Sequence, residues 1–109
     1  MIHGDYNTWN VILDDDLTCV KAVIDPFNCC WADSELDLYQ LNNANGKYYG
    51  LLDIYSAKFP LSENFPLKTS FYEFVSEINH YYDAKVDVRR SQVPEEAIEL
   101  EKQMTYFGI

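Results

Sequence analysis

The pattern of apolar and polar positions divides the chain into a first third typical of strands and turns and a longer remainder typical of helices. Residues 10–13 form a short apolar segment, and residues 19–24 form a segment rich in β-branched side chains. The acidic run from Asp14 to Asp16 lies between them, and runs of this kind favour turns. The two segments are therefore expected to form a β-hairpin. Its acidic run is expected to be a solvated turn, because three successive carboxylates converge on one metal ion only with special backbone geometry.

Helices are predicted for the remainder of the chain. Asp33 or Ser34 is a suitable N-cap for a first helix, which should end in the Asn-rich stretch 42–46. A second helix is expected over residues 47–59, where Pro60 stops it.

The third helix has the clearest pattern, with apolar residues three and four positions apart. These residues are Phe71, Phe74, Val75, Ile78 and Tyr82. A last helix is expected to start near Pro94, since proline is tolerated in a first turn and Glu95-Glu96 suit the positive end of the helix dipole. The whole pattern predicts an α+β fold, mostly α, in which a short hairpin is followed by a helical bundle.

The length of 109 residues suits one domain, so residues 1–109 are expected to form a single domain. The hydrophobic content of 48% excludes a disordered chain. The chain has no apolar run of bilayer length and no secretory-signal pattern, so a soluble, cytoplasmic protein is expected. Cys19, Cys29 and Cys30 are odd in number and the adjacent pair is strained as a disulfide, so they are expected to be buried, reduced thiols.

The formal net charge is -10. Such a charge repels phosphate backbones and anionic membranes, so neither nucleic acid nor a membrane is an expected partner. The pair Arg89-Arg90 is the candidate basic patch, and it is too small to change this expectation. An excess of acidic over basic residues most often reflects a solvated acidic surface. The net charge therefore gives only weak support to the binding of a metal ion or a cationic ligand.

The segment with the most informative chemistry runs from His3 to Asn10, and Asp25 follows the predicted hairpin. An Asp beside a substrate hydroxyl can orient it and accept its proton, which is the part expected of Asp5. An Asn five residues later can offer its carbonyl oxygen to Mg²⁺, and an Asp after a hairpin can bind the same metal. The hairpin returns the chain to one edge, so Asn10 and Asp25 are the predicted metal ligands. Taken together the residues indicate phosphoryl transfer, although each taken singly is also an ordinary turn or hairpin-edge residue.

In this order the motifs resemble the signature of the aminoglycoside phosphotransferase and fructosamine kinase superfamily, whose members are relatives of protein kinases. The residues that carry the resemblance are His3-Gly4-Asp5, Asn10, Asp25 and the helix start Glu35-Leu36-Asp37-Leu38. By this resemblance His3 and Asp37 brace the catalytic loop, and the fold is a kinase-like C-terminal lobe. The resemblance is good over residues 1–41, and residues 42–109 are compatible with the helical remainder of that lobe.

The resemblance implies an ATP-dependent phosphotransferase that acts on a hydroxyl of a small molecule, such as an aminoglycoside, a fructosamine or a similar amine-bearing substrate. Its cofactor and partners are then Mg²⁺, ATP and the acceptor. Related kinases carry a Gly-rich loop and a strand-borne Lys before the catalytic Asp, and four residues precede Asp5 here. The N-terminal ATP lobe is therefore expected to be absent and residues 1–109 alone to be inactive. The alternative is a non-catalytic C-lobe that serves as a binding or oligomerisation module, and its bare lobe interface predicts a homo-oligomer.

Four residues are weaker candidates for binding the substrate. Trp9 and Trp31 could stack on a sugar or attract a cation, although packing in the core is the favoured interpretation for both. Asp33 and Glu35 lie where acidic groups of the family could gather a cationic amine, and they equally suit the first turn of a helix. His80 is expected to be a partly exposed surface residue.

Overall fold

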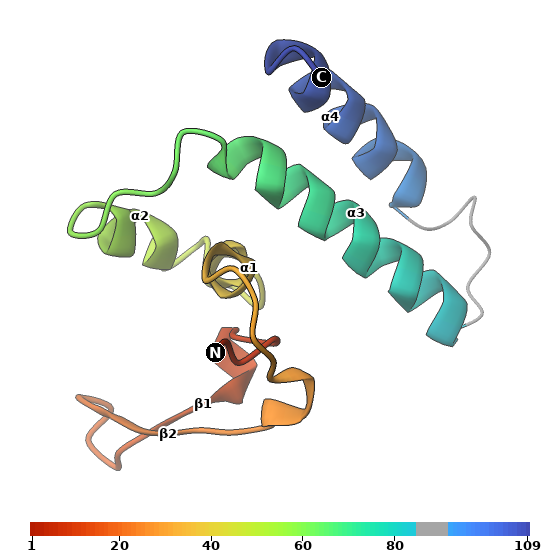
Figure 1. Cartoon of the computed structure of the whole chain (residues 1–109). Helices are drawn as coiled ribbons and strands as arrows, with labels where there is room; N and C mark the ends of the chain where they lie inside the picture. Colours follow the sequence, from red (N-terminus) through yellow and green to blue (C-terminus); the bar gives the residue numbers. More distant parts are fainter. Residues whose placement is uncertain (85–91) are drawn as a thin grey trace. The chain divides into compact units, whose positions relative to one another are not determined.

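A computed structural model describes residues 1–84 and 92–109 of the chain (Figure 1). The Arg89-Arg90 pair lies outside these described residues. The chain divides into two compact units, unit 1 over Met1–Leu61 and unit 2 over Ser62–Ile109. The expectation of a single domain stays a prediction.

Unit 1 contains the predicted hairpin. Strand β1 covers Val11–Leu13 and pairs antiparallel with β2, Val20–Val23, after the short 3-10 helix η1 at Thr8–Asn10. The register places Val11 opposite Val23, with an irregularity between Ile12 and Leu13. The hairpin prediction is confirmed.

The side chain of Asp14 holds the hairpin turn together. Its Oδ1 accepts the backbone N–H groups of Thr18 at 2.7 Å and Cys19 at 3.1 Å, and its Oδ2 accepts the Thr18 hydroxyl at 3.0 Å. The bonds from Cys19 and then Thr18 hold the pKa of Asp14 below its usual value, because they favour the ionised carboxylate. Asp15 and Asp16 are exposed, so the expectation of a solvated acidic turn is confirmed.

The helices of unit 1 are short. After η1 they are η2 at Pro26–Asn28, α1 at Glu35–Leu38, η3 at Tyr39–Asn42 and α2 at Leu51–Ser56. The first predicted helix is confirmed as α1 followed directly by η3. The second begins at Leu51 and not at Lys47, because Gly50 has left-handed backbone angles, φ 65° and ψ 31°, that interrupt a right-handed helix.

Unit 2 consists of two helices, α3 at Phe65–Ala84 and α4 at Val93–Tyr106, and they pack against each other. Helix α3 starts before the apolar pattern does, because Pro66 falls in its first turn, where the missing N–H does no harm. Helix α4 has Pro94 in its first turn, as predicted. The mixed, mostly helical fold class is confirmed.

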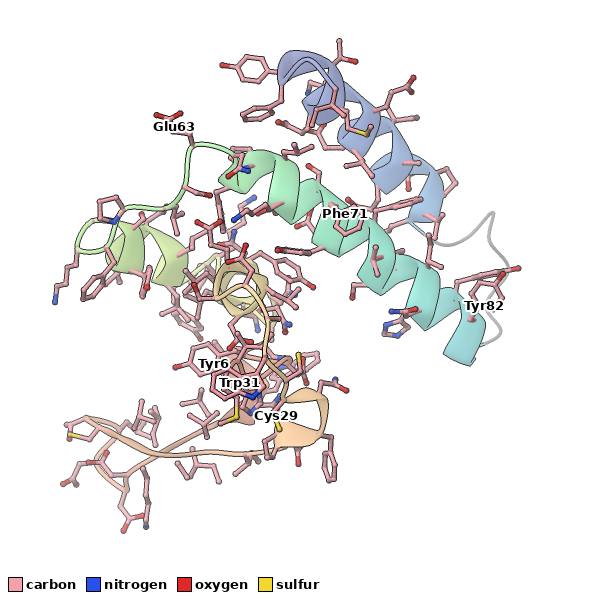
Figure 2. All side chains as sticks on the ribbon, in the orientation of Figure 1. Tyr6, Cys29, Trp31, Glu63, Phe71 and Tyr82 are labelled. Carbon is pink, nitrogen blue, oxygen red and sulfur yellow. The ribbon has the colours of Figure 1, made fainter. Side chains whose placement is uncertain are left out.

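The three cysteines are free and exposed, so the prediction of buried thiols is wrong while that of unpaired thiols is confirmed. Cys19 follows the hairpin turn, and Cys29 (Figure 2) and Cys30 follow η2, where the backbone runs along the surface of unit 1. Hydrophobic composition alone does not reveal this, because a small thiol is tolerated at either place.

Within residues 1–84 and 92–109, no helix combines the length and the apolar character that a bilayer crossing requires.

Candidate active site

Asp5 lies in the loop before η1, and two side-chain amides hold its carboxylate. Asn7 Nδ2 donates to Asp5 Oδ1 at 2.8 Å, and Asn10 Nδ2 donates to Asp5 Oδ2 at 2.8 Å. Asn10 Nδ2 also donates to the backbone carbonyl of Asp5 at 2.7 Å. Each carboxylate oxygen has room for a further donor, since an ionised carboxylate has about four acceptor positions.

The surroundings of Asn10 determine which way its amide points. The atom facing Asp5 meets only acceptors, a carbonyl and a carboxylate oxygen, so it must be the NH₂ group. The carbonyl oxygen Oδ1 of Asn10 therefore points away from Asp5. Asn10 is only 7% exposed, so this orientation is held in a largely dry environment.

Asp25 lies at the open end of the hairpin, directly after Ile24, the residue that pairs with Asn10. The N–H of Ile24 donates to the carbonyl of Asn10 at 2.9 Å, which extends the pairing of the two strands up to Asp25. Asp25 has left-handed backbone angles, φ 60° and ψ 53°, a conformation that Asp adopts more readily than most residues. A strained backbone at such a position is typical of functional sites.

The donor set at the open end of the hairpin fits magnesium. Mg²⁺ is a hard cation that prefers oxygen ligands, and it is commonly held in proteins by one or two carboxylates with water and phosphate completing the shell. The Asn10 amide oxygen and the Asp25 carboxylate are both of this kind. Within the described part of the chain, no group of three or more His, Cys, Asp or Glu side chains is arranged to hold a metal ion.

His3 connects the Asp5 loop to the end of β2. Its Nδ1 accepts the N–H of Asp5 at 3.3 Å, and its Nε2 donates to the carbonyl of Ile24 at 2.8 Å. Both bonds form together only when the imidazole proton is on Nε2. His3 thus links the backbone of Asp5 to the residue immediately before Asp25.

Asp37 holds the same loop from the side of α1. Its Oδ2 accepts the N–H of His3 at 2.7 Å and its Oδ1 accepts the N–H of Gly4 at 2.8 Å. The carbonyl of Gly4 accepts from Gln40 Nε2 at 3.1 Å. The peptide groups around Gly4 are therefore bonded on both sides by residues one turn apart in α1 and η3.

Gly4 has no acceptable replacement in this loop. Its φ is +84°, and a Cβ built on it would lie 2.3 Å from the carbonyl oxygen of Asn28. A glycine is required both by the left-handed backbone and by the close approach of the loop to η2.

Asn7 and Gln40 belong to this network, and the sequence analysis did not identify them. Gln40 follows Asp37 by three positions and so lies on the same side of the helical segment, which is the signal that could have indicated it. Asn7 had a weaker signal, because an Asn before a short helix is usually read only as an N-cap.

The predicted core positions of Trp9 and Trp31 are wrong. Trp9 is 78% exposed on η1, and Trp31 (Figure 2), in the loop before α1, is 86% exposed. Both sit on surface segments whose backbone does not turn them inward. Asp33 Oδ1 accepts the N–H of Glu35 at 3.0 Å, so these two acidic residues form the first turn of α1. A part for any of the four in substrate binding stays a prediction.

His80 is exposed on α3, as expected.

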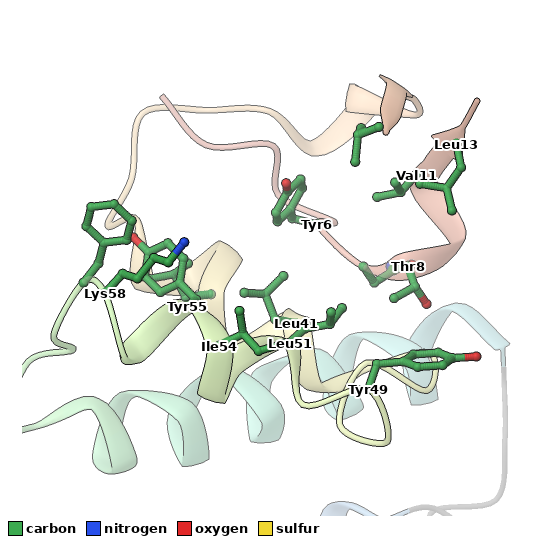
Figure 3. Close-up of a pocket in the computed structure, with 14 residues that line it drawn as sticks. Tyr6, Thr8, Val11, Leu13, Leu41, Tyr49, Leu51, Ile54, Tyr55 and Lys58 are labelled. Carbon is green, nitrogen blue, oxygen red and sulfur yellow. The ribbon is translucent and has the colours of Figure 1, made fainter. Parts of the chain in front are cut away.

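Unit 1 also has an apolar cavity of about 750 Å³ beside the Asp5 loop (Figure 3). Tyr6 and Val11 line one side of it, and Leu41 and Ile54 line another. Its volume lies in the usual range for small-molecule pockets, about 300–1,000 Å³.

A search of curated proteins and a search of solved structures returned no match. The family model of fructosamine kinase matches residues 1–86, which include Asp5, Asn10, Asp25 and Asp37. Because that match covers well over half of the chain, the chain belongs to the fructosamine kinase family.

Proposed function

We propose that residues 1–109 carry the catalytic Asp and the magnesium ligands of an ATP-dependent phosphotransferase that acts on a hydroxyl of a small, amine-bearing molecule such as a fructosamine. Membership of the fructosamine kinase family supports a kinase that acts on a small molecule. The observation that carries the finer proposal is the Asp5 carboxylate, which two amides hold with one hydrogen bond to each oxygen.

Asp5 is the general base in this proposal. Its two oxygens keep acceptor positions for the hydroxyl of the acceptor, which Asp5 orients and from which it takes the proton as the phosphoryl group arrives. In phosphoryl transfer, positioning and charge stabilisation supply most of the rate enhancement. A carboxylate that cannot rotate freely is suited to that task.

Asn10 and Asp25 are the proposed ligands of Mg²⁺, through the amide oxygen and the carboxylate. When bound, Mg²⁺ neutralises charge on the phosphates of ATP. His3 and Asp37 maintain the loop: His3 ties Asp5 to the end of β2, and Asp37 accepts two consecutive backbone N–H groups.

Two variants of the full-length gene product test these roles. Asp5→Asn should lower turnover about 100-fold or more while leaving the affinity for ATP nearly unchanged, because Asp5 acts on the acceptor and general bases contribute effects of this size. Asp25→Asn should weaken the binding of magnesium and nucleotide as well as lower turnover, and added Mg²⁺ should partly restore it. The measurements are steady-state kinetics with a fructosamine acceptor and nucleotide titrations.

The exposed acidic turn supplies a matched control. Asp16→Asn makes the same change of charge outside the site, and it should leave kinetics and nucleotide affinity unchanged. Ordinary turnover in Asp5→Asn would show that the catalytic assignment is wrong. Residues 1–109 by themselves should show no appreciable activity, since the groups that hold most of ATP in related kinases precede the catalytic Asp.

A second candidate function is a non-catalytic module that binds another protein or a second copy of itself. The favouring observation is the exposure of large aromatic side chains on unit 1, such as Trp31 and Phe27. The genomic sequence upstream of Met1 distinguishes the two candidates. An in-frame Gly-rich loop and Lys favour the kinase, and a stop codon with a promoter favours the module.

A further inference from the structure

We infer that Asn7 is a positioning residue for the phosphoryl transfer reaction, in addition to being the N-cap of η1; this inference rests on the proposed function. The side-chain amide of Asn7 makes contacts in two directions. Its Nδ2 donates to Asp5 Oδ1 at 2.8 Å, and its Oδ1 accepts the N–H of Trp9 at 3.0 Å.

These two contacts determine the orientation of the Asn7 amide. If the amide were turned over, its oxygen would face the Asp5 carboxylate and its NH₂ group would face the N–H of Trp9, so both hydrogen bonds would be lost. The backbone adds to this, because the N–H of Asn7 donates to the carbonyl of Asp5 at 3.1 Å. Asn7 therefore presents a donor to Asp5 Oδ1 in a direction that the start of η1 determines.

Asn7 and Asn10 each hold a different oxygen of the Asp5 carboxylate. Asn10 donates to Oδ2 and to the backbone carbonyl of Asp5, and its own amide oxygen is the proposed metal ligand. Asn7 donates to Oδ1, and its amide oxygen is used by Trp9. Asn7 thus has a part in orienting the carboxylate and none in holding the metal, which predicts a difference between their variants.

Asn7→Ser separates capping from positioning. Serine is as good an N-cap as asparagine, so it can keep the bond to the N–H of Trp9, but it has no amide to reach Asp5. Asn7→Asp also keeps the cap, and it places a second negative charge at hydrogen-bond distance from the Asp5 carboxylate. If Asn7 were only a cap, Asn7→Ser would behave like the wild type.

The kinetic test uses the full-length gene product. Asn7→Ser should lower kcat about 10-fold, and Asn7→Asp about 100-fold, with the KM for ATP and the magnesium dependence unchanged, because the loss is confined to orienting the general base. Asn79→Ser, the same substitution at an exposed position of α3, is the matched control and should leave kcat unchanged. A wild-type kcat in Asn7→Ser would overturn the inference, as would a changed magnesium dependence in that variant.

A spectroscopic test does not depend on activity. The ¹³C signal of the Asp5 carboxylate should move in Asn7→Ser and stay in place in Asn79→Ser, while the backbone amide spectrum outside the loop is unchanged in both. An Asp5 signal that stays in place in Asn7→Ser would overturn the inference even if the enzyme is a kinase. If the wild type transfers no phosphate, the proposed function fails, and a moving Asp5 signal then still identifies Asn7 as the residue that holds this carboxylate.

Discussion

Asp37 shows how one side chain can join parts of unit 1 that lie far apart in the sequence. It accepts the N–H of His3, 34 positions away, and the N–H of the following residue, Gly4. These are charge-assisted hydrogen bonds, which contribute more than bonds between neutral groups. The two bonds hold the backbone of the loop that presents Asp5.

Replacing Asp37 with Asn should therefore destabilise the protein. An Asn side chain has one oxygen, so its NH₂ group would face one of the two backbone N–H groups and leave it without an acceptor. The expected loss in the free energy of unfolding is about 1–3 kcal/mol, the usual cost of an unsatisfied polar group. Urea denaturation followed by circular dichroism measures it. Asp16→Asn, an equal change of charge in the exposed turn, is the control, and an equal stability of the two variants would contradict the role of Asp37.

The proposed metal ligands give a second prediction at this scale. Two protein oxygens leave most of the coordination shell to water, so Mn²⁺ should bind the chain weakly in the absence of nucleotide. In an NMR titration, the signals of Asn10 and Asp25 should broaden before those of the exposed acidic turn at Asp14 to Asp16. Broadening that begins at the turn, or that spreads evenly over all acidic residues, would count against the two ligands.

At the scale of the elements, the helices α3 and α4 bring acidic side chains close together. The pKa of Glu96 is raised above its ordinary value of 4.5, first because the side chain is partly buried. The negative charges of Glu77 on α3 and of Glu95 and Glu99 on α4 raise it further. Like charges thus oppose the packing of the two helices, and apolar contacts between them have to outweigh this repulsion.

A carboxyl whose pKa is higher in the folded state than in the unfolded state binds more protons when the protein is folded. The contribution of Glu96 to the free energy of unfolding therefore falls as the pH rises above 4.5. Glu96→Gln removes the charge and should raise Tm by about 2 °C at neutral pH, a shift expected from a few tenths of a kcal/mol in a domain of this size. Well below pH 4.5 the carboxyl of Glu96 is protonated, so neither protein carries a charge at this position and their Tm values should agree. Glu101→Gln, on the exposed side of α4, should show a smaller effect, and a lower Tm for Glu96→Gln at neutral pH would contradict the prediction.

The elements that the sequence predicted correctly are those with strong local signals. The hairpin follows from two apolar segments around an acidic turn, and the start of α4 follows from Pro94. The start of α2 could not be predicted, because it depends on the left-handed backbone angles at Gly50, which a helical apolar pattern does not reveal. The start of α3 was missed because its first turn, which contains Pro66, precedes the apolar pattern that begins at Phe71.

For the candidate site, too, the sequence indicates residues linked by local structure and not those linked by the folding of the unit. The choice of Asp5, Asn10 and Asp25 as site residues stays a prediction, and it rests on their spacing, in which Asn10 and Asp25 flank a locally predicted hairpin. The hydrogen bonds from Asn7 and Gln40 could not be predicted, since each depends on where the loop that presents Asp5 lies in the folded unit. Trp9 and the three cysteines are exposed because the fold does not cover the faces on which they lie. The periodicity of apolar residues does not show which faces the fold covers.

At the scale of the whole molecule, the chain keeps many large apolar side chains at its surface. Within residues 1–84 and 92–109 the buried apolar side chains are Ile2, Tyr39 and Phe65. Phe27 is 90% exposed in unit 1, and Tyr106 is 82% exposed in unit 2. The apolar cavity of unit 1 adds to this surface. Exposed apolar patches of this kind commonly mark sites of contact with other molecules.

We therefore expect residues 1–109 to form a homodimer or a higher oligomer in solution, because association removes apolar surface from water and most soluble oligomers are symmetric assemblies of one chain. Light scattering over a range of concentrations should give a mass that rises above the 12.7 kDa of the monomer. Ile54→Glu, at an exposed position of α2 that lines the cavity, should shift the assembly toward monomer, since a charge there opposes the burial of apolar surface. Ser76→Glu adds the same charge at an exposed polar position of α3 and should leave the assembly unchanged. A strict monomer at the highest concentration would refute the expectation, and equal dissociation of the two variants would attribute the effect to net charge instead of the cavity surface.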